Sequence, residues 1–150
     1  MDTSCKELRS ISHQMASDVL IKLGIVAAIK DFIQNIDQNL LKTNFQSVGL
    51  DERISSGIET VLYRIVQESV NNVIKHAKAT HLDIQLLKEA HELTLIIEDN
   101  GVGFNINEME NFNGIGLRNI KSRIEYLKGT IDFDSAPNRG TVISIFVPLV

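Results

Sequence analysis

The chain has 150 residues, of which 43% are hydrophobic and 23% are charged, as in ordinary soluble globular domains. Its net charge is −4 with no block of like charges, which argues against direct nucleic-acid binding or anionic-membrane binding as the main task. The single cysteine, Cys5, excludes an internal disulfide and fits a reducing compartment. No apolar run is long enough to span a bilayer.

The first part of the chain, from about residue 6 to residue 36, is predicted to be helical. Gly24 interrupts this helix, and we expect only a modest cost. A short strand is expected near Phe45–Val48, and we place the boundary between a helical lead-in (residues 1–40) and the main domain (residues 41–150) before it. The apolar residues of the helix recur at steps of three and four, as one buried stripe requires: Leu8, Ile11, Met15, Val19, Leu23, Val26, Ile29, Ile33 and Ile36.

A second helix is predicted from about Asp51 to Ala79. Glu68, Asn72 and Lys75 cluster along one rim of its apolar face, which is the pattern of a helix that floors a pocket. The alternative is that these side chains simply meet water. That alternative suits Lys75 but not the pair Asn71-Asn72, because asparagine is a mediocre helix former.

Four alternating patterns then predict four strands, each with one face in the core. The apolar positions are Leu82, Ile84 and Leu86; Leu93, Leu95 and Ile97; Ile131 and Phe133; and Ile143, Ile145 and Val147. A helix is predicted from Gly114 to Lys128, stopped by Gly129. This order of elements predicts an α+β fold, a two-layer sandwich with a mixed sheet and its helices on one face.

The glycine-rich stretch Asp99–Phe104 directly follows the second of these strands. Asn-Gly after a strand is a strong hairpin signal, so a simple turn is one interpretation. A ligand site is the other, because Gly101 and Gly103 lack a Cβ and let the backbone pass close to a bound group. Further glycines favour the ligand site: Gly114 and Gly116 open a predicted helix, and Gly140-Thr141 opens the last strand.

These segments together resemble the ATP-binding domain of sensor histidine kinases, in the superfamily shared with gyrase, Hsp90 and MutL (the Bergerat-type ATP-binding fold). Gln67–Ala77 resembles the N box of that family, and Asp99–Phe104 resembles the first glycine box. Gly114–Leu117 and Gly140-Thr141 resemble the second and third. The resemblance extends from about Gly57 to the C-terminus, and the subgroup it resembles most is that of kinases paired with NarL-type response regulators.

The residue chemistry suggests roles for these positions, and the resemblance implies the same roles. The Asp99 carboxylate would accept a hydrogen bond from the adenine amine, and the Asn72 carbonyl would bind Mg²⁺. Lys75 would contact phosphate, whereas His76 either donates to phosphate or only caps the helix. Glu68 would accept a proton or hold a water. The remaining predicted nucleotide-binding residues are Gly101, Gly103, Gly114, Gly116, Leu117 and Thr141, with Asn105–Asn113 as a lid and Arg118 as a phosphate contact or a surface residue.

Two departures from the family pattern stand out. An acceptor histidine followed by an acid, on the first helix of a hairpin, is missing: His13 precedes Gln14, and His91-Glu92 falls in a predicted hairpin turn. Asn119 stands where many relatives have glycine. The expected partners are therefore a phosphoacceptor helical hairpin outside this chain, a response regulator, and a second copy in the full-length protein. We expect a cytoplasmic fragment whose parent is membrane-anchored, as such kinases usually are.

Three other kinds of site, a P-loop phosphate site, a zinc site and a serine-hydrolase site, are excluded because their motifs are absent. No Gly-Lys-Ser/Thr phosphate loop, no zinc ligand spacing and no Gly-x-Ser-x-Gly elbow occurs. Three hypotheses remain. The leading one is a protein-histidine kinase domain that binds ATP and Mg²⁺, and the others are a serine kinase of the anti-sigma type and a non-catalytic module that binds nucleotide as a switch.

Overall fold

The computed structural model describes residues 18–103 and 120–149, without the side chains of His76 and Ala77. Five strands form one sheet: β1 (Lys42–Val48), β2 (His81–Glu89), β3 (Glu92–Asp99), β4 (Thr130–Ser135) and β5 (Thr141–Pro148). Their order is β1-β2-β3-β5-β4, with β1 parallel to β2 and the other neighbours antiparallel. The sheet is therefore mixed, as predicted.

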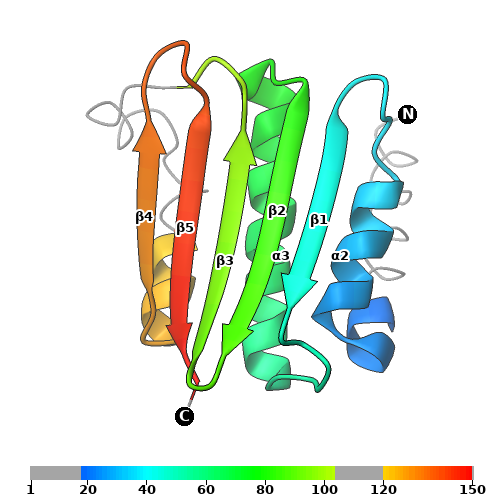
Figure 1. The fold of residues 1–150 in the computed structure, drawn as a ribbon, viewed down its shortest axis with the longest axis vertical. Coiled ribbons are helices and arrows are strands. Elements are labelled where there is room, and N and C mark those ends of the chain that lie inside the picture. Colours follow the sequence, from blue (N-terminus) through cyan, green and yellow to red (C-terminus); the bar gives the residue numbers. More distant parts are fainter. Residues whose placement is uncertain (1–17, 104–119, 150) are drawn as a thin grey trace, which may run out of the picture.

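The helices lie together behind one face of this sheet (Figure 1). They are α2 (Ile25–Gln34), α3 (Ser56–Asn72) and its π-helical extension η1 (Val73–Ala77), with further helical residues at 18–23 and 120–126. In Figure 1, α3 lies between α2 and the helical residues 120–126. The predicted two-layer α+β sandwich is confirmed.

The core fills the space between these two layers. Along β3, Leu93, Leu95 and Ile97 are buried and alternate with more exposed residues, so the strand turns its apolar side toward the helices. The sheet register places Leu95 opposite both Leu86 and Ile145, which extends the same buried row across three strands. All four strands predicted from alternation are present, and the short strand predicted near Phe45–Val48 is β1.

Within the described residues, no helix is both long enough and apolar enough to cross a membrane.

The first helix differs from its prediction at Gly24. One helical stretch ends at residue 23 and α2 begins at Ile25, because Gly24 has φ 94° and ψ 179°. The backbone of Gly24 still takes part in the hydrogen bonds of both helical stretches. Its N–H donates to the Leu20 carbonyl at 3.0 Å, and its carbonyl accepts from the Ala28 N–H at 3.1 Å. The expectation of a continuous helix with a modest glycine cost was wrong here. Gly24 breaks the helix because its positive φ lies outside the right-handed helical region, which glycine tolerates without steric cost.

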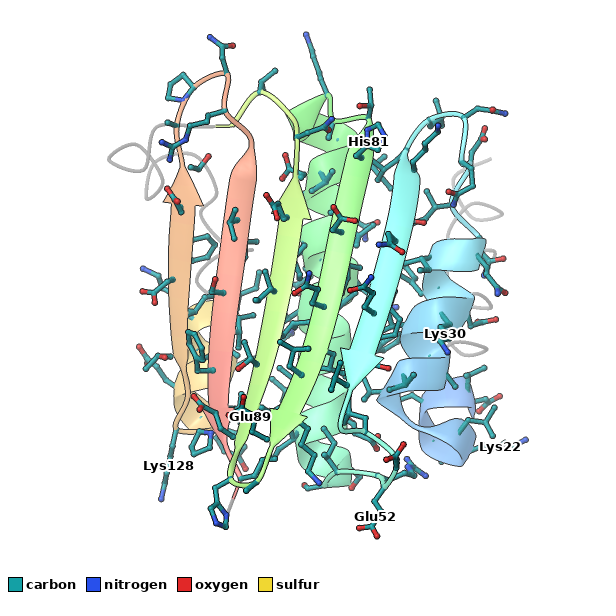
Figure 2. The ribbon with its side chains drawn as sticks, in the orientation of Figure 1. Lys22, Lys30, Glu52, His81, Glu89 and Lys128 are labelled. Carbon is teal, nitrogen blue, oxygen red and sulfur yellow. The ribbon has the colours of Figure 1, made fainter. Side chains whose placement is uncertain are left out.

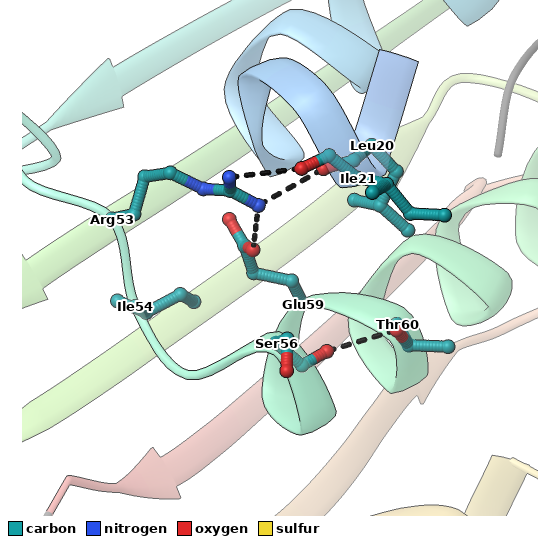
Figure 3. A pocket seen from close by; sticks show the side chains of 7 residues that line it. All are labelled: Leu20, Ile21, Arg53, Ile54, Ser56, Glu59 and Thr60. Carbon is teal, nitrogen blue, oxygen red and sulfur yellow. Dashed lines mark hydrogen bonds and ion pairs between the residues drawn. The ribbon is translucent and has the colours of Figure 1, made fainter. Parts of the chain in front are cut away.

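The second helix begins at Ser56, later than predicted. Arg53 lies before the helix and instead binds the residues around Gly24 and Glu59 (Figure 3). Its guanidinium donates to the carbonyls of Ile21 at 2.9 Å and Leu20 at 3.0 Å, and to Glu59 Oε1 at 2.8 Å. Glu59 is 2% exposed, and its Oε2 accepts from the Ile25 N–H at 3.0 Å. The segment before α3 is thus tied to the break at Gly24 instead of continuing the helix.

We predict that Glu59→Gln lowers the free energy of unfolding by about 2 kcal/mol. The glutamine amide has one acceptor oxygen, so either the Ile25 N–H or the Arg53 guanidinium would face an NH₂ group. Urea denaturation measures this. The matched control is Glu52→Gln, at an exposed glutamate in the same loop (Figure 2), which should change stability by less than about 0.5 kcal/mol. Equal effects of the two substitutions would contradict the assignment.

Candidate functional site

Several predicted site residues gather at one end of the sheet. β3 ends there with Asp99, β4 ends with Ser135, and β5 begins with Thr141. The C-terminal end of α3 with η1 reaches the same end, where His81 begins β2 (Figures 1 and 2). Segments far apart in the sequence therefore converge at this end, as the leading hypothesis requires.

Asp99 is a buried carboxylate at the mouth of β3. Asp99 is 8% exposed, and its Oδ1 accepts a hydrogen bond from the Gly101 N–H at 2.8 Å. Burial raises the pKa of Asp99 above its ordinary value of 3.8, and the neighbouring Glu98 adds to this, while backbone hydrogen bonds from Gly101 and Thr141 oppose it. An ionised carboxylate has about four acceptor positions, so it has capacity for a further donor.

Asn100 connects the end of β3 to the start of β2. Its Oδ1 accepts from the backbone N–H groups of Thr80 and His81, each at 2.9 Å, and its Nδ2 donates to Thr80 Oγ1 at 2.9 Å. Thr80 follows closely on η1, which ends at Ala77 and is followed by Lys78 with φ 52°. Asn100 therefore ties the segment after Asp99 to the exit of the α3 helix, a role that the hairpin interpretation did not include.

Gly103 and Gly140 fit two loops against each other. A Cβ on Gly103 (φ 67°) would lie 2.1 Å from the Ala136 carbonyl oxygen, and a Cβ on Gly140 (φ 80°) would lie 2.3 Å from the Asp99 carbonyl oxygen. The Asn138 N–H also donates to the Val102 carbonyl. These glycines are thus required by packing between backbones, and their approach to a base or sugar stays a prediction.

Thr141 lies opposite Asp99 in the register of β3 and β5. It is 7% exposed, and its Oγ1 is 2.8 Å from Oγ of Ser135, which also donates to the Gly140 carbonyl at 3.1 Å. Thr141 is one of the predicted site residues, whereas Ser135 is not. Its signal was a serine at an inward position of β4, where apolar residues are expected.

The end of the α3 helix carries the other predicted residues. Glu68 and Asn72 are half-buried, and Lys75 is exposed. Lys75 and His76 lie in η1, a π-helical turn of a kind that often occurs at functional sites. The polar rim predicted for this helix is therefore present in the structure. The roles of Glu68, Asn72, Lys75 and His76 stay predictions.

The rest of the predicted site lies outside the described residues. This applies to Gly114, Gly116 and Leu117, to Arg118, and to the lid Asn105–Asn113. Cys5 and His13 lie outside them as well.

Arg123 contacts this site, although the sequence analysis did not select it. Its Nη1 donates to Glu68 Oε1 at 3.1 Å, across 55 positions of sequence. The signal was present, because Arg123 falls three residues after Ile120 and four before Leu127, two positions predicted to point inward. A charged residue on the buried side of a helix normally has a partner, because burying an unpaired charge is costly.

Comparison with known proteins decides the family. Residues 57–150 match the family model described as histidine kinase-, DNA gyrase B- and HSP90-like ATPase. The chain belongs to this ATPase family. The resemblance drawn from the sequence boxes is thereby confirmed, and the matched residues contain both ends of the site, from Glu68 on α3 to Thr141 on β5.

The curated relatives of this ATPase-family chain include named histidine kinases. It is 32% identical over 148 residues to the signal transduction histidine-protein kinase/phosphatase DegS of Brevibacillus brevis, covering 98% of this chain and 38% of that protein. It is 30% identical over 144 residues to the oxygen sensor histidine kinase NreB of Staphylococcus carnosus, covering 95% of this chain and 42% of that protein. The chain thus spans about two fifths of the length of these relatives.

Solved structures show the same fold. Acinetobacter baumannii histidine kinase AdeS aligns with a TM-score of 0.66 at 18% identity, covering 99% of this chain and 83% of that chain. The histidine kinase domain of the Erythrobacter litoralis blue-light activated kinase EL346 aligns with a TM-score of 0.61 at 19% identity, covering 91% of this chain and 58% of that chain. At these identities the likeness concerns the fold.

We predict that Asp99→Asn gains stability relative to the wild type as the pH rises above about 4. Because the folded-state pKa of Asp99 is raised, its contribution to stability is fully present below the ordinary value of 3.8 and is lost as the pH rises through the folded-state value. Asparagine does not titrate, so the difference in stability should move in favour of the variant between pH 4 and pH 7. Thermal unfolding at pH 4 and pH 7 measures this. With Asp132→Asn, at an exposed position of β4, as control, a variant advantage larger at pH 4 than at pH 7 would contradict the prediction.

The two-loop packing makes a second prediction. Gly140→Ala should cost about 2 kcal/mol or more, because the new Cβ meets the Asp99 carbonyl and positive φ disfavours alanine. Gly57→Ala is the control, since a Cβ there comes no closer than 3.7 Å to Ser55 Oγ. Being in a helix, this control should gain about 0.5 kcal/mol. Chemical denaturation of both variants tests the pair, and a tolerated Gly140→Ala would refute the packing argument.

Proposed function

We propose that this chain is the ATP-binding catalytic domain of a sensor histidine kinase in a two-component system, and that it binds Mg-ATP. The observation that carries the proposal is the Asp99 carboxylate, buried at the mouth of β3 in a chain of this ATPase family. Burial disfavours the charged form of Asp99. An asparagine at this position could accept the same hydrogen bond from the Gly101 N–H without this cost. Such an arrangement supports a ligand whose donor group pairs with the carboxylate.

The residues at this end of the sheet fit a nucleotide. The second carboxylate oxygen of Glu68, Oε2, is buried and has no hydrogen-bond partner among the described residues, and a bound ligand is one explanation for such a group. Asn72 offers a neutral oxygen, and Mg²⁺ is commonly held by one or two protein ligands together with substrate phosphates. Among the described residues, no group of three His, Cys, Asp or Glu side chains could hold a metal ion by itself.

ATP supplies the γ-phosphoryl group, which would pass to a histidine outside this chain. The side chains of this chain would bind and orient. Asp99 would accept from the adenine amine and disfavour guanine, which presents a carbonyl at that position. Asn72 would hold the magnesium ion, and Lys75 would neutralise phosphate charge. Glu68 would accept a proton or hold a water at the transfer step.

The proposed partners are those of the kinase class. The curated relatives are named histidine kinases, which favours phosphotransfer to histidine over transfer to serine. We therefore propose a phosphoacceptor helical hairpin in the parent protein, a response regulator of the NarL type, and homodimerisation of the full-length kinase. The predicted boundary at residue 40 and a membrane anchor in the parent belong to the same proposal.

Isothermal titration of this chain with ATP in excess Mg²⁺ tests the nucleotide site. We expect binding by the wild type, binding weakened at least about tenfold in Asp99→Asn, and much weaker binding of GTP than of ATP. The control Asp132→Asn should bind ATP as the wild type does. Absence of ATP binding by the wild type, or equal affinities of wild type and Asp99→Asn, would overturn the proposal. Glu68→Gln should still bind ATP while phosphohistidine formation falls, which separates a kinase from a module that only binds nucleotide.

A further inference from the structure

The Glu68 carboxylate is held by one of its oxygens only. Oε1 accepts from Arg123 at 3.1 Å, while Oε2 is buried and has no partner in the part of the chain that the structure describes. A buried carboxylate oxygen without a hydrogen bond costs free energy, and such groups in native proteins call for an explanation. The explanation fits the proposed nucleotide site: one oxygen is used to orient the side chain, and the other is left for the reaction.

The Arg123 guanidinium is presented by a well-anchored helix. Ile120 and Ile124, on the same helical stretch, are each 1% exposed, and the Gly129 N–H closes its end on the Ile124 carbonyl at 2.9 Å. The side chains of Arg123 and Glu68 are 30% and 32% exposed. A pair at this exposure makes a contribution that a double-mutant cycle can detect but that is small beside the stability of a whole domain, so stability alone is a weak reason for its presence.

We propose that Arg123 is the positioning residue for Glu68. Arg123 fixes the carboxylate so that Oε2 faces the site at the transfer step. This inference rests on the proposed function. It assigns Arg123 no contact with the nucleotide, so its removal should slow phosphotransfer while ATP affinity is kept. A misplaced catalytic group can reduce the rate strongly even when its own chemistry is intact.

The first experiment needs no nucleotide. A double-mutant cycle of Arg123→Gln and Glu68→Gln, followed by urea denaturation of this chain, measures whether the two side chains are coupled. We expect the double variant to lose less stability than the sum of the two single losses. The control cycle uses Arg139→Gln and Asp134→Asn, an ion pair at 2.7 Å whose side chains are 64% and 72% exposed, and it should be close to additive. Additive losses in the Arg123 cycle would overturn the proposal.

The second experiment separates binding from transfer. ATP affinity is measured by titration of this chain, and phosphohistidine formation is measured in a kinase chain long enough to include the acceptor histidine. Arg123→Gln should keep the Kd for ATP within about twofold while the rate of transfer falls roughly tenfold or more. Arg123→Lys should recover part of the rate, because it keeps the charge. In a Glu68→Gln background, Arg123→Gln should add no further loss of rate.

The outcomes are distinguishable. If the wild type binds no ATP, the proposed function fails, while the nucleotide-free cycle still reports on the pair. If ATP binds and Arg123→Gln transfers at the wild-type rate, the positioning role is refuted and the proposed function stands. If Arg123→Gln loses ATP affinity instead of rate, Arg123 contacts the nucleotide itself, which also refutes the proposal.

Discussion

The constraint on which this end of the molecule depends is the burial of the Asp99 carboxylate. Antiparallel pairing of β3 with β5 sets Asp99 opposite Thr141, and the chain then turns so that the Gly101 N–H returns to Oδ1. Gly140 lets a second backbone pass close to the Asp99 carbonyl. A neutral side chain would be easier to bury. Keeping an acid there makes sense if a ligand uses its charge.

The same end of the sheet is joined to the helical layer by polar contacts. Asn100 binds the backbone just beyond η1, so that the segment following Asp99 and the segment following Asn72 cannot move independently without breaking hydrogen bonds. The π-helical turn η1 changes the backbone geometry between the end of α3 and the start of β2. The relative placement of Asp99 and the α3 residues is thus set by a side-chain network as well as by the hydrophobic core.

The sequence predicted the strands, the fold class and the rim of α3 because each depends on local periodicity. Leu93, Leu95 and Ile97 alternate, and Glu68, Asn72 and Lys75 recur at helical spacing, whatever the partner elements are. Sequence-based prediction failed where the local structure involves a contact with a residue far away in the sequence. Glu59 accepts from the Ile25 N–H beside the break at Gly24, Arg53 bonds Glu59 from the segment before α3, and Glu68 is held by a residue 55 positions away. For Glu59 and Arg123, a charged residue beside buried apolar positions of a helix was the local sign of such a partner.

Two acids of α3, the buried Glu59 and the half-buried Glu68, connect this helix to the elements on either side of it. Glu59 and Glu68 are nine residues apart, which at about 100° per residue places them on opposite sides of the helix axis. Glu59 accordingly meets the N–H of Ile25 at the start of α2 together with Arg53, whereas Glu68 meets Arg123 on the other flanking helical stretch. Figure 1 shows α3 between these two neighbours. The helical residues before Gly24 contact Arg53, and Arg53 pairs with Glu59 at the end of α3 opposite to Asn72. The geometry therefore places the site at one end of α3 and the connection to the preceding chain at the other.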